Sequence, residues 1–205
     1  AGRKTVCIED CTPDVRLLLP TLLPRISYLL LKLSPMLDIT AALRSLPQTR
    51  EVHVVSVDGE CKELLLVLSG ALTTPSPAPL TNHAVGLRHD QTEPAFAFVF
   101  QPQDEQLAQP VYATQPQEWL LEPDPAVLKA APLKLLCQRF QVQKLAPMSH
   151  LYTSPVPVPQ WPGRIFRVES TYTFSKQDLR ALLADTPRAA LPARGFPQSV
   201  AELRE

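Results

Sequence analysis

The residues best suited to chemistry follow a short apolar run. Residues 26–33 (ISYLLLKL) have the length and composition of a strand covered on both faces, and Lys32, Ser34, Pro35 and Asp38 stand at or just after its end. In open α/β sheets, ligands bind in the crevice outside the carboxyl ends of the strands. This loop is therefore the first candidate for a substrate pocket. A plain connection between strand and helix, capped by Asp38, explains the same residues equally well.

A second candidate set is acidic and lies near the start of the chain. Glu9, Asp10 and Asp14 gather around a predicted helix start, in which Thr12 offers a capping hydroxyl and Pro13 suits the first helical position. Acids at this place complement the helix dipole, and the same acids could instead form a loop that faces substrate. No catalytic base or nucleophile is assignable, and the G-x-S-x-G elbow of hydrolases does not occur.

Cysteine and histidine spacing argues against a metal site. Cys7-x3-Cys11 lacks the second Cys/His pair of a four-ligand zinc site, and His83-x5-His89 is predicted to lie in a loop without partners. We therefore expect no metal. The four cysteines are too sparse for a disulfide scaffold and follow no secretory signal, so we expect a reducing, cytoplasmic location.

Basic residues are interleaved with aromatic ones only near the end of the chain. Residues 161–205 hold 7 basic and 5 acidic side chains, and such a mixture suits phosphate contact and base stacking. The candidates for RNA contact are Arg164, Arg167, Lys176 and Arg194. A surplus of two charges also fits an ordinary solvated face.

The overall composition excludes several classes of protein. Lys plus Arg and Asp plus Glu both number 20 in 205 residues, so the chain has neither a strongly basic arm nor an acidic tail. A hydrophobic content of 45% excludes wholesale disorder, and no apolar run approaches the roughly 20 residues of a membrane span. Only 6 glycines are present, and neither a GxGxxG turn nor a P-loop occurs.

The first third of the chain is predicted to alternate helices and strands. Pro20 and Pro24 limit the first helix, and a short helix runs from Asp38 or Thr40 through Leu46. A strand rich in β-branched residues at 51–57 is followed at once by Asp58-Gly59, a strong hairpin signal, and by a return strand at 60–68.

The rest of the chain has a mixed pattern with two Pro-rich segments. We expect linkers at 71–80 and 155–162, a helix at 124–140, a helix at 176–184 and another from 199, and strands at 95–100, near 142 and 151, at 164–174 and at 191–196. The predicted division is into residues 1–77, 78–160 and 161–205. The start at Ala1 and the final run SVAELRE, which has no helix stop signal, predict a piece of a longer protein.

Seven stretches, in order along the chain, resemble one family. The sequence is similar to the bacterial class I S-adenosylmethionine-dependent methyltransferases with a C-terminal THUMP-like domain, in their Bacteroidetes-type form. The stretches are IEDCTPDV (8–15), LLKLSPMLDI (30–39), EVHVVSVDGECKELL (51–65), EPDPAVLKA (122–130), SHLYTS (149–154), FRVESTYTFSKQDLRALL (166–183) and RGFPQSVAELR (194–204).

The resemblance implies an α/β fold in which this chain is the C-terminal part. Residues 1–77 would be the second half of a Rossmann-like methyltransferase sheet that ends in an antiparallel hairpin, with 26–33 as its fifth strand. Residues 78–160 would be an α+β connecting region and 161–205 an incomplete THUMP-like domain. The Gly-rich turn that holds S-adenosylmethionine, and the DP-x-R type motif after the fourth strand, would lie before Ala1.

The implied function is methyl transfer, with RNA as the substrate class because THUMP domains generally bind RNA. By analogy, residues 32–38 would line the acceptor side of the pocket and residues 9–14 would flank it. Fold alone does not fix function. A non-catalytic RNA-binding module and a methyltransferase acting on a small molecule or a protein remain alternatives, and no membrane partner is expected.

Overall fold

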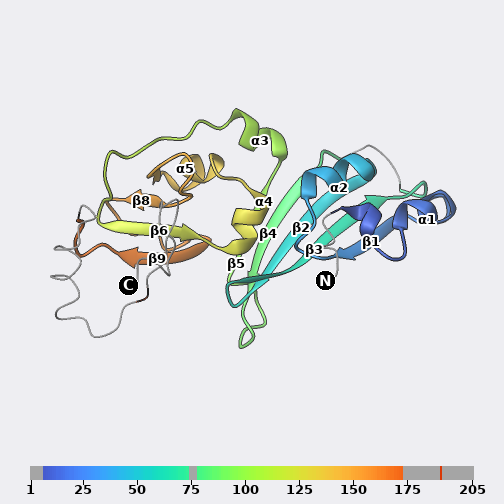
Figure 1. The fold of residues 1–205 in the computed structure, drawn as a ribbon, viewed down its shortest axis with the longest axis horizontal. Coiled ribbons are helices and arrows are strands. Elements are labelled where there is room, and N and C mark those ends of the chain that lie inside the picture. Colours follow the sequence, from blue (N-terminus) through green and yellow to red (C-terminus); the bar gives the residue numbers. More distant parts are fainter. Residues whose placement is uncertain (1–6, 74–77, 173–189, 191–205) are drawn as a thin grey trace.

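A computed structural model describes residues 7–73, 78–172 and 190, and within them the chain forms two sheets that lie side by side (Figure 1). Sheet A contains five strands in the order β1-β3-β2-β4-β5, and sheet B contains four in the order β7-β8-β6-β9. The strands of sheet A are β1 (Tyr28–Leu33), β2 (Thr49–Val57), β3 (Glu60–Ser69), β4 (Thr81–Leu87) and β5 (Phe96–Phe100).

Short helices connect these strands and precede them. Their bounds are η1 (Ile8–Asp10), α1 (Val15–Leu22), η2 (Leu23–Arg25), α2 (Ile39–Ser45) and α3 (Pro102–Leu107). Asp14, rather than the expected Thr12, caps α1, and Pro20 lies inside that helix instead of ending it. The cap of α2 is Asp38, and the helix stops before Pro47 as the sequence predicts.

The hairpin predicted at Asp58-Gly59 is confirmed. Both residues have positive φ angles, 49° and 76°, which suit the tight turn between antiparallel strands β2 and β3. Strand β3 also pairs with β1 in antiparallel fashion, so it lies between β1 and β2 and runs opposite to both. The sequence pattern identified the hairpin because the turn signal is local.

Strand β1 is not covered on both faces, contrary to the expectation from its apolar run. Its residues alternate between exposed and half-buried, and Tyr28 and Leu30 are each 61% exposed. β1 is also an edge strand, since β3 is the neighbour it has within the described residues. An apolar run predicts that both faces of a strand are covered by apolar side chains, but it does not show whether the described residues provide that cover.

Strand β4 was missed by the sequence analysis, which placed His83 in a loop. Residues 81–87 instead pair in parallel with β2 and in antiparallel fashion with β5. Asn82 and Gly86 lower the intrinsic strand propensity of this segment, and the strand depends on two non-local neighbours. Because β2 pairs with β4, sheet A runs across residue 77, the predicted end of the first unit.

Sheet B and its helices follow a connection that contains α3, which was also not predicted. The elements are β6 (Trp119–Pro123), α4 (Pro125–Ala130), α5 (Leu135–Phe140), β7 (Gln143–Lys144), β8 (Tyr152–Ser154) and β9 (Gly163–Arg167). The single helix expected at 124–140 is two helices. Ala131 ends α4 in the left-handed conformation. The following Pro132 disfavours a right-handed helical conformation at position 131, which explains why the helix does not continue.

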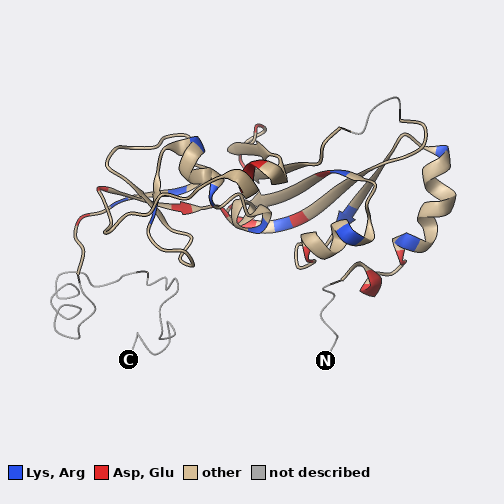
Figure 2. Ribbon diagram, turned by 90° about the horizontal axis from the view of Figure 1, so that it is seen from above, with Lys and Arg blue, Asp and Glu red and all other residues tan. Residues whose placement is uncertain are grey.

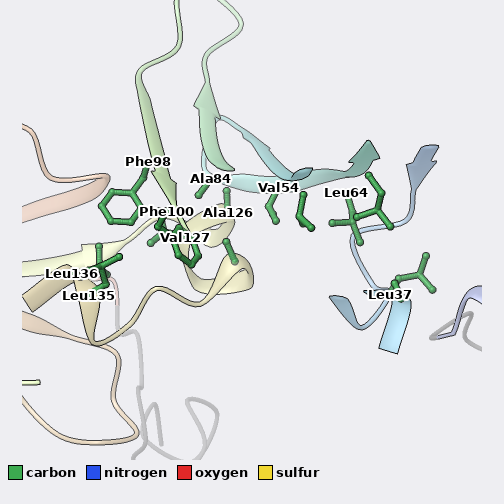
Figure 3. Packing of buried hydrophobic residues seen from close by; sticks show 14 of the residues in the cluster. Leu37, Val54, Leu64, Ala84, Phe98, Phe100, Ala126, Val127, Leu135 and Leu136 are labelled. Atoms are coloured by element: carbon green, nitrogen blue, oxygen red, sulfur yellow. The ribbon is translucent and has the colours of Figure 1, made fainter. Parts of the chain in front are cut away.

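The core lies on one face of sheet A and continues into sheet B. Val54 and Leu64 point from adjacent strands toward Leu37, and Ala126 and Val127 of α4 pack below Ala84 (Figure 3). In sheet B, Trp161 packs against Phe140 and Tyr152, with ring centroids 5.3 and 5.2 Å away.

The Pro-rich segment at 155–162, expected to be a linker, thus contributes a buried anchor to sheet B through Trp161. The strand expected at 164–174 corresponds to β9, which ends at Arg167. The elements expected after residue 175 lie outside the described residues. Among the described helices, none has the length and apolar character needed to cross a membrane.

Candidate functional site

The loop after β1 is held by its own side chains. Lys32 forms an ion pair with Glu63 of β3, with 2.9 Å between Nζ and Oε1. The Ser34 hydroxyl accepts a hydrogen bond from the Met36 amide at 3.2 Å, and the Asp38 carboxylate accepts one from the Ala41 amide at 2.7 Å. These contacts form a tight turn that leads into a capped helix, which is the plainer of the two interpretations of this loop.

The same loop is anchored to a distant part of the chain. Leu37 is 1% exposed, and its backbone carbonyl accepts a hydrogen bond of 2.6 Å from Nζ of Lys129 in α4. Helix α4 also packs against β2, β3 and β4. The loop that follows β1 therefore has its position set by a helix that begins the second half of the fold.

The acidic candidates are joined by Arg16, which the sequence analysis did not single out. The Arg16 guanidinium contacts Glu9 at 2.8 Å and Asp14 at 2.7 Å, while its backbone amide donates to Asp14 as the helix cap. These hydrogen bonds hold the pKa of Asp14 below its ordinary value, so its carboxylate stays ionised. An Arg two residues after an Asp near a predicted helix start is the signal that could have revealed this network.

Glu9 also links the start of the chain to α2. Its Oε1 accepts a hydrogen bond of 3.3 Å from the Ser45 hydroxyl at the last residue of α2. Beside this contact lies a hollow of about 320 Å³ that Gln48 helps to line, and Oε1 of Gln48 is buried without a hydrogen-bond partner. The walls come from α1, η2 and the segment after α2 and consist of Arg16, Leu19, Pro20, Leu23, Pro24, Ser45, Pro47 and Gln48.

The two candidate sets lie at opposite ends of α2. Asp38 caps its first turn, whereas Glu9 meets Ser45 at its last residue, and seven helical residues span about 10 Å. Within the described residues, no hydrogen bond or ion pair joins residues 9–14 to residues 32–38. The structure thus brings Glu9 and Asp14 together through Arg16, but it does not bring them into contact with the loop after β1.

The Cys11 thiol, which lies among these acids, is a poor nucleophile. Burial raises the pKa of Cys11, and the nearby carboxylates of Asp10, Asp14 and Glu9 raise it further. The reactive form of a cysteine is the thiolate, so Cys11 is held in its less reactive, protonated form.

Two of the RNA-contact candidates lie on β9 and form ion pairs with one acid in β6 and one just before it. Arg164 pairs with Glu122 at 2.5 Å, and Arg167 pairs with Glu118 at 3.3 Å, although both arginines stay largely exposed. Because side chains alternate along a strand, these two arginines leave β9 on opposite faces. Lys176 and Arg194 lie outside the described residues.

The charges of the described residues do not separate into a basic and an acidic region. Figure 2 shows blue and red segments interspersed over both sheets. Near β9, the exposed Phe166 ring lies 5.7 Å from the Arg164 guanidinium carbon, so one aromatic ring and one cation are available together there.

The described residues contain no Gly-rich turn of the kind expected to bind S-adenosylmethionine. The four described glycines are Gly59 in the hairpin turn, Gly70 just after β3, Gly86 within β4 and Gly163 at the start of β9. None of these follows a strand and opens a helix, which is the place where a Gly-rich turn holds a nucleotide in this kind of fold. The cofactor is therefore not assigned to any residue of this chain.

Comparisons with known proteins support the resemblance that the sequence analysis identified. Residues 119–162 match a family described as a ferredoxin-like domain, and residues 163–205 match a family described as THUMP domain-like. The chain matches no curated protein.

Among solved structures, a candidate methyltransferase from Porphyromonas gingivalis W83 is 38% identical to this chain. The match covers 99% of this chain and 50% of that protein, with a TM-score of 0.86. The chain thus spans about half the length of the structure it matches. It resembles a candidate methyltransferase along nearly all its length and has a THUMP-like region at its end.

Proposed function

We propose that this chain is the C-terminal half of a class I S-adenosylmethionine-dependent methyltransferase that modifies RNA. The observation that supports this most strongly is the similarity to the P. gingivalis candidate methyltransferase, because it extends over 99% of this chain at 38% identity. Identity at that level over the whole length supports a shared function as well as a shared fold.

The strand order of sheet A gives independent support for a Rossmann-like methyltransferase sheet. In the family that the sequence resembles, the last two strands form an antiparallel hairpin beside the fifth strand. Here β3 returns between β1 and β2 and runs antiparallel to both, as the resemblance implies, but the sheet does not end at this hairpin, because β4 and β5 extend it beyond β2.

The cofactor would supply an activated methyl group to a nucleophilic atom of the acceptor. This chain's own residues would shape the acceptor side of the pocket. The loop of residues 32–38 stays our candidate for that role, because the capping of α2 and the bond from Lys129 fix its backbone. The ion-paired Glu9 and Asp14 would form a rigid flank.

RNA is proposed as the substrate class because of the THUMP-like match at residues 163–205. The described start of that segment, β9, carries Arg164 and Phe166 and is an edge strand of sheet B among the described strands. A cation and an aromatic ring can contact phosphate and stack on a base, respectively.

The decisive experiment uses a protein that extends this chain upstream by roughly 150 to 200 residues, the ordinary size of a domain. It is incubated with S-adenosylmethionine labelled in the methyl group and with separate fractions of RNA, protein and small molecules. We expect label in the RNA fraction. The matched control is the 205-residue chain alone, for which calorimetry should detect no micromolar binding of the cofactor.

Other outcomes would decide between the alternatives. Label in the protein or small-molecule fraction would overturn RNA as the substrate class while keeping methyl transfer. RNA binding without label in any fraction would favour a non-catalytic RNA-binding module. Micromolar cofactor binding by the 205-residue chain alone would contradict the proposal that the cofactor site lies outside it.

A further inference from the structure

Two histidines and a glutamate come together on the half-exposed face of sheet A, opposite the core. Glu51 and His53 are two residues apart on β2 and so share one face of that strand. His83 on β4 is the direct register partner of His53 across the parallel pair. One possible ligand atom from each of the three residues lies within 4.8 Å of the other two, and all three residues are half-buried.

The donor set is that of a transition-metal site with an open position. Two imidazoles and one carboxylate are the ligands of a common class of zinc site, whose fourth place is left to water or substrate. Nε2 of His53 lies 2.8 Å from Oε2 of Glu51. Two ligand atoms on a tetrahedral zinc ion, each bonded at about 2.0 to 2.2 Å, are about 3.3 Å apart, so a small outward movement would admit the ion.

The ring of His83 must turn for its nitrogen to join them. The His53 and His83 rings are stacked, with centroids 4.2 Å apart and planes 15° from parallel. The lone pair of an imidazole nitrogen lies in the ring plane, so stacked rings do not aim at a common point. The bond between Cβ and the ring has broad torsional freedom, and rotation about it would direct the His83 nitrogen toward the cation.

The surroundings favour the neutral form of His83 that a metal needs. Burial lowers the pKa of His83, and the neighbouring His53 lowers it further, while Glu51 acts in the opposite direction. The Thr81 hydroxyl lies 3.2 Å from Nε2 of His83, and the β5 residue opposite His83 is the uncharged Val99.

A second carboxylate on the same face is already occupied. Glu63 of β3 lies opposite Val55 of β2 and pairs with Lys32 of β1 at 2.9 Å. Glu51 therefore supplies the negative charge closest to the two imidazoles. Among the described residues, its hydrogen bond to His53 is the side-chain contact that a cation would have to replace on the carboxylate side.

We propose that Glu51, His53 and His83 bind one divalent transition-metal cation of the zinc type. The ligands come from β2 and β4, so the cation would join the hairpin strands to the strand that follows residue 77. Binding to the folded chain alone would stabilise the sheet by mass action. This site is independent of the cofactor and RNA assignments above.

The test is a titration of the chelator-treated chain with ZnCl2 by calorimetry, and with CoCl2 by visible absorption. We expect one equivalent to bind, and we expect Glu51→Gln and His83→Gln each to weaken binding at least about tenfold, since even outer-shell substitutions can cost that much. His89→Gln is the matched control, because His89 is exposed and pairs with Asp58 outside the cluster. Circular dichroism checks that each variant folds.

A nuclear magnetic resonance readout tests the geometry itself. One equivalent of ZnCl2 should shift the ring signals of His53 and His83 and leave those of His89 unchanged, and acidification should release the ion because protons compete for the imidazoles. Absence of binding at 100-fold excess of ZnCl2 would overturn the proposal. Equal loss of affinity in His89→Gln, or full affinity in both Glu51→Gln and His83→Gln, would overturn it as well.

Discussion

Nζ of Lys129 donates a hydrogen bond of 2.6 Å to the backbone carbonyl of Leu37, 92 positions earlier in the chain. The contact joins the first helix of the second half of the fold to the loop that follows β1. That loop holds our candidates for the acceptor side of the pocket. Because Lys129 fixes the loop, its position depends on a residue that a motif search around the loop would not include.

Replacing Lys129 with Met should destabilise the fold while keeping the apolar stem of the side chain. A hydrogen bond from a charged donor contributes about 1 to 3 kcal/mol, and the Leu37 carbonyl would lose its partner. Urea unfolding measures the difference. Lys62→Met is the control, because Lys62 forms an exposed pair with Glu60 and should change the free energy of unfolding by less than about 0.5 kcal/mol. Equal effects of both substitutions would contradict the anchoring role.

Stability should rise between pH 5 and pH 8 because of two half-buried histidines. Burial lowers the pKa of both His83 and His150 below the ordinary value of 6.5, so the unfolded chain binds more protons than the folded chain in this range. The free energy of unfolding therefore falls as the pH falls through 6.5. Urea unfolding at several pH values, with a chelator present to exclude metal, measures the slope. His83→Gln should flatten it, and an unchanged slope would argue against the assignment to His83.

The isolated 205-residue chain should self-associate through the edge of β1. This strand is long and apolar, exposes Tyr28 and Leu30, and has an outer edge that no described strand occupies. An unpaired apolar edge is a template for pairing with another chain. Leu30→Lys should reduce the association seen by light scattering, whereas Leu17→Lys, on the exposed side of α1, should not. A monodisperse wild-type chain would refute this prediction.

RNA binding, if it involves β9, should depend on Arg164 and Arg167. We expect Arg164→Gln and Arg167→Gln each to weaken binding and to reduce the salt dependence by about one unit of slope per lost phosphate contact. Glutamine is preferred to a charge reversal at position 164, because a new carboxylate would face the buried Glu122. Arg25→Gln, on the exposed η2 turn, is the control. Unchanged affinity and slope in both β9 variants would exclude these contacts.

Local signals in the sequence predicted the elements that depend on local chemistry. The Asp58-Gly59 turn and the Asp38 cap were identified because the residues that cause them are adjacent to the structures they form. Strand β4 was missed because its pairing partners, β2 and β5, decide its conformation more than its own residues do. The break at Ala131 could have been foreseen from Pro132.

The candidate sites show the same division. The cap role of Asp38 follows from its place in the sequence, whereas the Leu37 anchor requires a lysine from α4. His53 and His83 are 30 positions apart, and only the parallel register of β2 and β4 makes them neighbours. The alternation of Glu51 and His53 in a strand-like run was the one part of that cluster visible beforehand.

The parallel pairing of β2 with β4 has a consequence for protein engineering. A junction placed between residues 73 and 78, where composition suggests a linker, would take β4 and β5 from a different parent than β2, so the pairing of β2 with β4 would have to form between segments of two proteins. Chimaeras between this chain and its relatives should therefore be joined in the connection between α3 and β6. There the donor and the recipient would each keep a whole sheet.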